Sequence, residues 1–156
     1  MSDRLTHLNE RGEAHIVDIG GKAITTRRAV ARARIEAQPA TIEAITDGTL
    51  KKGDALAVAR IAGIMAAKKT SELIPLCHPI ALNRVEVEIF AEEGQLVVLA
   101  TAETNDRTGV EMEAMTAASV AALTLYDMAK GIDRAMRIST VELVEKSGGK
   151  SGDFRR

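Results

Sequence analysis

The chain has 156 residues, of which 46% are hydrophobic and 28% charged, a balance typical of one globular domain with a substantial core. A formal net charge of −1 argues against a general nucleic-acid binder, and two Phe, one Tyr and no Trp leave little surface for stacking bases. The single cysteine, Cys77, excludes an internal disulfide, and no stretch reaches the roughly 20 apolar residues of a membrane helix. We therefore expect a cytoplasmic protein.

Periodicity and boundary residues predict the elements in chain order. Small or apolar residues alternate with charged ones over 29–37, which indicates a half-buried strand because strand side chains point to opposite faces in turn. Pro39 suits a first helical turn, Asp54 an N-cap and Gly131 the left-handed residue after a helix. The predicted elements are a short strand over 15–19, a strand over 29–37, helices over 39–48 and 55–68, strands over 84–91 and 95–103 joined by a hairpin turn, a helix over 109–130 and a strand over 138–145.

This order matches the βαββαβ plan of a ferredoxin-like α+β sandwich, in which helices cover one face of an antiparallel sheet. We expect a flexible N-terminal arm over 1–13, one catalytic domain over 14–146 and a flexible Gly/Ser-rich tail over 147–156. The uncovered face of the sheet would be a natural place for a partner chain. Because this fold serves many functions, function has to be argued from particular residues.

A stiff loop between Leu73 and Pro79 presents Cys77 and His78. Two prolines restrict its backbone, so the loop is either a rigid platform for a thiol and an imidazole or a tight turn around a buried cysteine. We do not expect a metal site, because Cys77 and His78 are adjacent and the chain has no second cysteine.

Charged residues mark both ends of the long helix predicted over 109–130. Glu111 and Glu113 either complement the helix dipole or belong to a site, and at about 200° apart on a helical wheel they share a site only if the helix entry is not helical. Asp127 and Lys130 form either a surface ion pair or an acid–base pair, since the dipole disfavours a carboxylate near a helix C-terminus.

Lysines are spread along the chain, among them Lys52 where a helix opens, Lys146 where a strand ends and Lys150 in the tail. They either solubilise the surface or converge on phosphate groups. The segment Gly149-Lys150-Ser151 partly matches a phosphate-binding loop. It fails the full pattern because Val144 stands where the first glycine is required, so a nucleotide hydrolase is rejected.

Seven segments carry a family resemblance over essentially the whole chain: Lys52–Asp54, Ala59–Ile64, Ala66–Lys68, Leu73–Pro79, Thr108–Ala114, Tyr126–Met128 and Lys146–Gly152. Together they closely resemble the molybdenum cofactor biosynthesis protein C family, the cyclic pyranopterin monophosphate synthases. The resemblance implies a lyase that converts 3′,8-cyclo-7,8-dihydroguanosine 5′-triphosphate to cyclic pyranopterin monophosphate and pyrophosphate. It also implies a homohexamer, a trimer of dimers with active sites between subunits, and no cofactor, metal, nucleic acid or membrane partner.

The same resemblance assigns the site residues. They are Leu76, Cys77, His78, Met112, Glu113, Glu111, Lys52 and Lys146 as substrate contacts, and Asp127 with Lys130 as the catalytic pair. The chemistry suits these types, because ring opening and closure need an acid and a base, and a departing pyrophosphate needs positive charge. A non-catalytic ligand-binding or regulatory domain is an alternative. An RNA-recognition module is another, but the predicted strands offer only Phe90 for stacking.

Overall fold

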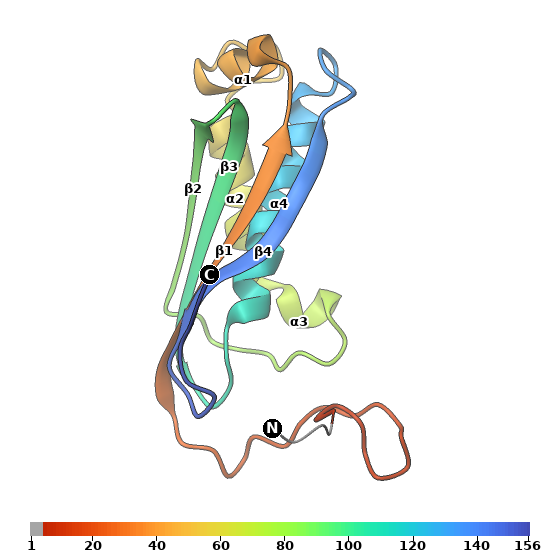
Figure 1. Ribbon diagram of the computed structural model, residues 1–156, viewed down its shortest axis with the longest axis vertical. Helices are drawn as coiled ribbons and strands as arrows, with labels where there is room; N and C mark the ends of the chain where they lie inside the picture. The colour runs from red at the N-terminus through yellow and green to blue at the C-terminus, as the bar shows by residue number, and fades with distance from the viewer. Residues whose placement is uncertain (1–4) are drawn as a thin grey trace.

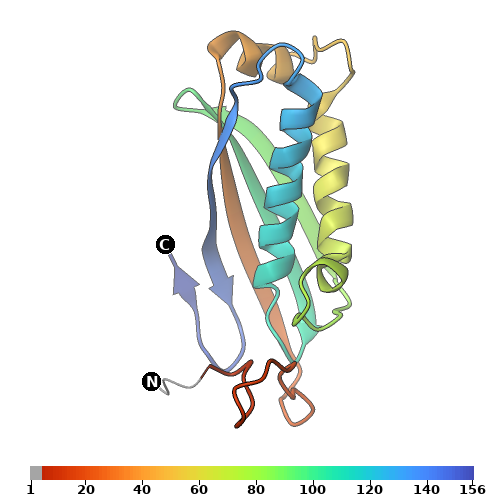
Figure 2. The same cartoon turned by 90° about the vertical axis from the view of Figure 1, so that its right-hand side faces the viewer.

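The computed structural model describes residues 5–156 as an antiparallel sheet with helices on one face (Figures 1 and 2). The sheet order β2-β3-β1-β4-β5 contains the arrangement of a ferredoxin-like sandwich, so the predicted α+β fold is confirmed. The elements are β1 (Thr25–Glu36), α1 (Pro39–Thr46), α2 (Ala55–Lys68), α3 (Thr70–Leu73), β2 (Arg84–Glu92), β3 (Gln95–Asp106), α4 (Glu111–Ala129), β4 (Arg137–Ser147) and β5 (Phe154–Arg155).

The alternating pattern of β1 determines which side of the sheet is buried. Ala29, Ala31 and Ala33 are fully covered, and they lie opposite Ala102, Ala100 and Val98 of β3. Small side chains on the covered face let α2 and α4 lie close to the strands, whereas Arg28, Arg32 and Arg34 of β1 alternate onto the other face. The predicted strand is thus confirmed and is longer than expected at its N-terminal end.

The helices α2 and α4 cross closely because residues without bulk meet at their contact. A Cβ added to Gly63 in α2 would lie 2.9 Å from the backbone oxygen of Ala117 and 3.2 Å from the Cβ of Ala121, both in α4. Such distances leave no room for a side chain. Figure 2 shows the two helices running side by side along the sheet.

Side-chain caps fix two helix starts. Asp54 begins α2 as predicted, since its carboxylate accepts a hydrogen bond of 3.0 Å from the backbone N–H of Ala57. The start of α1 is capped from a distance by Asp133, which is buried. Its carboxylate accepts hydrogen bonds from the Gln38 N–H at 2.9 Å and the Thr41 hydroxyl at 3.0 Å. Asp133 therefore ties the loop after α4 to α1.

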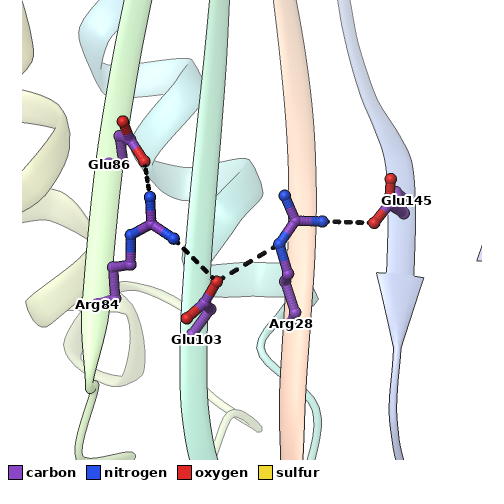
Figure 3. Close-up of polar contacts among 5 residues, drawn as sticks. All are labelled: Arg28, Arg84, Glu86, Glu103 and Glu145. Carbon is purple, nitrogen blue, oxygen red and sulfur yellow. Dashed lines mark hydrogen bonds and ion pairs between the residues drawn. The ribbon is translucent and has the colours of Figure 1, made fainter.

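The open face of the sheet carries a row of ion pairs across four strands (Figure 3). Arg84 of β2 pairs with Glu86 and lies 3.3 Å from Glu103 of β3. Glu103 is also 3.4 Å from Arg28 of β1, which pairs with Glu145 of β4. Each of these charges has a partner of opposite sign on its own or a neighbouring strand, so the row is held together by pairs formed within the chain.

Two local predictions are wrong. Residues 15–19 form no strand, because β1 already has β3 and β4 on its two sides and the segment leaves the sandwich instead of joining it. Gly131 is not left-handed: the N–H groups of Ile132 and Asp133 both bond to the Ala129 oxygen, which satisfies the helix end without such a residue.

The predicted N-terminal arm is described only in part, whereas the predicted C-terminal tail is described in full. Residues 1–4 of the predicted arm lie outside the described residues, and a single bridge between Leu8 and Ala14 closes a turn in its remainder. In the predicted tail, β5 folds back and pairs with β4, so Phe154 and Arg155 extend the sheet. Sequence periodicity gave no sign of this two-residue strand.

Candidate active site

A cavity of about 260 Å³ lies at the start of α4. Three chain segments enclose it: the loop after α3, the first turn of α4 and the N-terminal segment that runs beneath the sandwich. Six of the predicted site residues line it, namely Leu76, Cys77, His78, Glu111, Met112 and Glu113. The structure therefore brings the two central motifs together, although they lie about 35 residues apart in the sequence.

Glu111 and Glu113 share the cavity despite their angular separation on a helix. The helix begins at Glu111 after a non-helical Val110, so the cavity faces the end of the helix and not one of its sides. Both residues are nevertheless helical, so the non-helical entry that the sequence analysis required for a shared role is absent, and they share the cavity because it lies at the end of the helix.

Glu113 is the most perturbed acid of the cavity. Its side chain is only 3% exposed, and burial raises the pKa of its carboxyl to about 7, with the nearby charge of Glu111 acting in the same direction. A hydrogen bond from its own backbone N–H partly offsets this rise. A carboxyl with a pKa near neutrality can both hold and release a proton at physiological pH.

The raised pKa of Glu113 predicts a pH-dependent stability. Between about pH 4.5 and 7 the folded chain holds a proton that the unfolded chain has lost, so the free energy of unfolding falls as the pH rises through this window and then levels off. We expect this decrease in the free energy of unfolding to be smaller by about 1–3 kcal/mol in Glu113→Gln. Urea unfolding of the wild type and the variant at pH 5 and pH 8 measures the difference, with the exposed Glu43→Gln as the control. An equal pH dependence of the wild type and Glu113→Gln would contradict the prediction.

Cys77 and His78 occupy the cavity in different ways. Burial raises the pKa of the Cys77 thiol, and the Glu113 carboxylate adds to the effect, so the sulfur stays protonated at neutral pH. The Nε2 atom of His78 lies 2.6 Å from the backbone oxygen of Val17 in the N-terminal segment. The loop is therefore a platform for the imidazole more than for a nucleophilic thiol.

A cationic region adjoins this cavity. The ammonium group of Lys146 lies 2.9 Å from Glu111 and donates to the hydroxyl of Ser151 at 2.8 Å. Beyond it, a second cavity of about 470 Å³ is lined by Lys22, Arg27 and Lys150. The Nε atom of Arg27 is buried and has no hydrogen-bond partner among the residues described. Unpaired cationic donors of this kind suit a phosphate group.

Asp127 and its lysines form a separate cluster at the other end of α4. Lys130 lies 2.9 Å from one carboxylate oxygen of Asp127, and Lys52 lies 3.4 Å from the other and 2.8 Å from the Asp127 backbone oxygen. The hydrogen bond and charge of Lys130, with a further contribution from Lys52, hold the pKa of Asp127 below its ordinary value. Asp127 is thus ionised at neutral pH despite the helix dipole.

One chain does not unite the two groups of predicted residues. Helix α4 is continuous from Glu111 to Ala129, so the 14 residues from Glu113 to Asp127 span about 21 Å along its axis. Lys146 lies at the Glu113 end, whereas Lys52 and Lys130 lie at the Asp127 end.

Several residues near the cavities escaped sequence reasoning. Those of the main cavity come chiefly from the N-terminal segment and are Thr6, His7, Val17, Ile19 and Lys22, with Ile80 from elsewhere. Arg27 and Arg28 lie close to Lys146. The segment is irregular, so no periodicity marks it. An available signal was Lys22, which together with Asp18 is a charged residue among the apolar residues and glycines of 16–24.

Residues 5–156 offer neither a metal site nor a membrane helix. No set of three His, Cys, Asp or Glu side chains is grouped closely enough to hold a metal ion. No helix in the same part of the chain combines the length and apolar character needed to cross a bilayer.

Fold and site together define a ferredoxin-like α+β protein with a buried carboxyl and an imidazole beside a cationic region. Comparison with known sequences agrees: the chain matches the MoaC family over residues 16–149. Cyclic pyranopterin monophosphate synthases of Thermomicrobium roseum and Parvibaculum lavamentivorans are 56% and 54% identical to it, over 97% of this chain and 93% and 96% of their own lengths. The cyclic pyranopterin monophosphate synthase of Herpetosiphon aurantiacus is 57% identical, over 97% of this chain and 93% of its own length. The chain belongs to the MoaC family.

Proposed function

We infer that the chain is a cyclic pyranopterin monophosphate synthase. It is a lyase that converts 3′,8-cyclo-7,8-dihydroguanosine 5′-triphosphate to cyclic pyranopterin monophosphate and pyrophosphate, an early step of molybdenum cofactor biosynthesis. The observation that carries this inference is the near-full-length identity to proteins of that name. The site adds chemical support because it combines groups that exchange protons with groups that bind phosphate.

The two adjoining cavities suit the two parts of this substrate. The guanine-derived ring system presents N–H groups and carbonyl oxygens, and the main cavity offers Glu113 and His78 to contact them. The triphosphate carries several negative charges, and Lys22, Arg27 and Lys150 line the neighbouring cavity. We assign ring recognition to the first cavity and phosphate binding to the second, with Lys146 between them.

Asp127 and Lys130 are proposed as the catalytic pair. Asp127 is ionised and can accept a proton, while Lys130, 2.9 Å away, can donate one. Lys52 contacts the same carboxylate and is proposed to bind the departing phosphate oxygens. Each of these three side chains is partly exposed, so a substrate can reach them.

The separation of the two clusters supports a site shared between subunits. A substrate of nucleotide size cannot contact Glu113 and Asp127 of the same chain if about 21 Å of helix lies between them. We propose that the Glu113 end of one chain meets the Asp127 end of another, in a homohexamer built as a trimer of dimers. A symmetric interface would create such sites in pairs.

One assay tests the function directly. Purified protein is incubated with the cyclic triphosphate, and the products are analysed by mass spectrometry. Equimolar cyclic pyranopterin monophosphate and pyrophosphate are expected. Tight binding of the substrate without turnover would instead favour a non-catalytic ligand-binding domain.

The lysines proposed for phosphate binding carry a prediction. Lys52→Ala and Lys146→Ala should each weaken binding of the triphosphate by about 1.5–3 kcal/mol, and that of a monophosphate analogue by less, because each removes a charge-assisted contact. The loss should shrink as salt is added. Titration calorimetry measures it, with exposed Lys51→Ala as the control. Equal losses for both ligands would remove these lysines from the phosphate site.

A further inference from the structure

The N-terminal segment enters the site through one polar contact. The Nε2 atom of His78 lies 2.6 Å from the backbone oxygen of Val17. A carbonyl oxygen can only accept a hydrogen bond, so Nε2 must carry the hydrogen. In a neutral imidazole the other nitrogen, Nδ1, then has a lone pair and no hydrogen. Among the residues described, Nδ1 has no hydrogen-bond partner.

From this contact we propose that the Val17 carbonyl fixes His78 in the Nε2–H form, so that Nδ1 is the nitrogen that accepts a hydrogen bond from an N–H or O–H group of the substrate. The N-terminal segment is then a positioning element of the site. The substrate part of this proposal rests on the proposed function, whereas the tautomer and the anchoring of the segment do not.

The surroundings of the contact support a positioning role. Residues 15–24 contain no strand or helix, and among the residues described the bond to His78 is the only hydrogen bond that ties this stretch to the sandwich. The same stretch supplies Val17, Ile19 and Lys22 to the cavity wall. One imidazole therefore holds the wall of the cavity in place and also lines the cavity.

The chemical consequence is selection of a donor group. Neutral His78 offers an acceptor at Nδ1, and close by Glu113 offers a carboxyl with a pKa of about 7. A ring edge that presents an N–H beside a carbonyl oxygen, as a guanine-derived ring does, can donate to the imidazole and accept from the protonated carboxyl. A ligand without the N–H leaves Nδ1 unpaired and should bind more weakly.

The tautomer can be read by nitrogen NMR on the intact, uniformly ¹⁵N-labelled protein. Spectra are recorded near pH 8, where an ordinary imidazole is neutral. His78 is assigned by the signal missing from His78→Gln, and the chain has only two other histidines to distinguish. We expect a protonated Nε2 and an unprotonated Nδ1. Protonated Nδ1, or rapid exchange between both forms as in a free histidine, would overturn the proposal.

Two variants separate the anchoring role from the substrate role. In His78→Gln the side-chain amide nitrogen can reach the position of Nε2 and donate to Val17, whereas in His78→Asn the shorter amide stands near the position of Nδ1. Hydrogen exchange of residues 15–24, followed by mass spectrometry, should match wild type in the Gln variant and be about tenfold faster in the Asn variant. Exchange in β3 is the internal control for folding.

Activity completes the test. The Gln variant keeps the segment anchored but lacks Nδ1, so its kcat/KM should fall about tenfold or more. Wild-type activity in that variant would overturn the substrate contact, and unchanged exchange in the Asn variant would overturn the anchoring role. If the wild-type protein has no synthase activity, the proposed function fails, while the NMR and exchange results still decide the tautomer and the anchoring.

Discussion

Asp127→Asn is expected to lower kcat by about 10²–10⁴-fold, because the amide has nearly the same shape but cannot exchange a proton. Asp127 is exposed and its contacts are with Lys52 and Lys130, so melting temperature and oligomeric state should not change. Initial rates of product formation, followed by mass spectrometry, measure the effect. The matched control is Glu43→Gln, which neutralises another exposed helix carboxylate.

The same carboxylate makes a prediction about pH. The hydrogen bond and charge of Lys130 hold the pKa of Asp127 below its ordinary value, so activity that needs ionised Asp127 is lost only as the pH falls through that lowered value. Replacing Lys130 with Met should raise the pKa and move the acidic limb of the residual activity to higher pH. Full activity of Asp127→Asn, or an unmoved acidic limb in the Lys130 variant, would remove Asp127 from proton transfer.

Mixing two inactive variants is expected to restore activity. In the proposed shared site, Glu113→Ala and Asp127→Asn each damage one half, so a chain with intact Glu113 should complete a chain with intact Asp127. Random co-refolding of equal amounts should make about a quarter of the sites wholly intact. A site contained in one chain would give none, because every chain carries one lesion.

The control for mixing is to combine the two proteins without unfolding, which should leave the activity low if subunits exchange slowly. Native mass spectrometry of the refolded sample confirms that mixed oligomers have formed. Mixed oligomers with no more activity than either parent would contradict the shared site for Glu113 and Asp127. The same spectra report whether six chains assemble, as proposed.

Local sequence rules predicted those parts of the fold that depend on neighbouring residues. The alternation over 29–37 was sufficient for β1, since strand side chains repeat every two residues, and Asp54 marked the start of α2 because a cap acts within one turn. The apolar residues over 15–19 gave a strand signal that no free neighbouring strand could satisfy. Pairing depends on the whole sheet, and a short segment carries no information about it.

The candidate site was predictable in its motifs but not in its electrostatics. The two motifs around His78 and Glu113 were identified from residue types and resemblance, and the structure places them in one cavity. The raised pKa of Glu113 depends on burial created by tertiary packing, which no spacing rule contains. Val17 contacts His78 only through its backbone oxygen, which no residue type reveals. Arg27 cannot be distinguished by sequence from the other charged residues of β1.

The glycine contact between α2 and α4 has a mechanical consequence. Because Gly63 lies against Ala117 and Ala121 with no free space, α4 can neither slide along α2 nor bend toward it without a steric clash. The helix is therefore a rigid spacer that keeps its two charged ends at a constant separation. Any closure around a substrate must then come from movement of the loops at either end or, in the proposed hexamer, from the relative rotation of whole subunits.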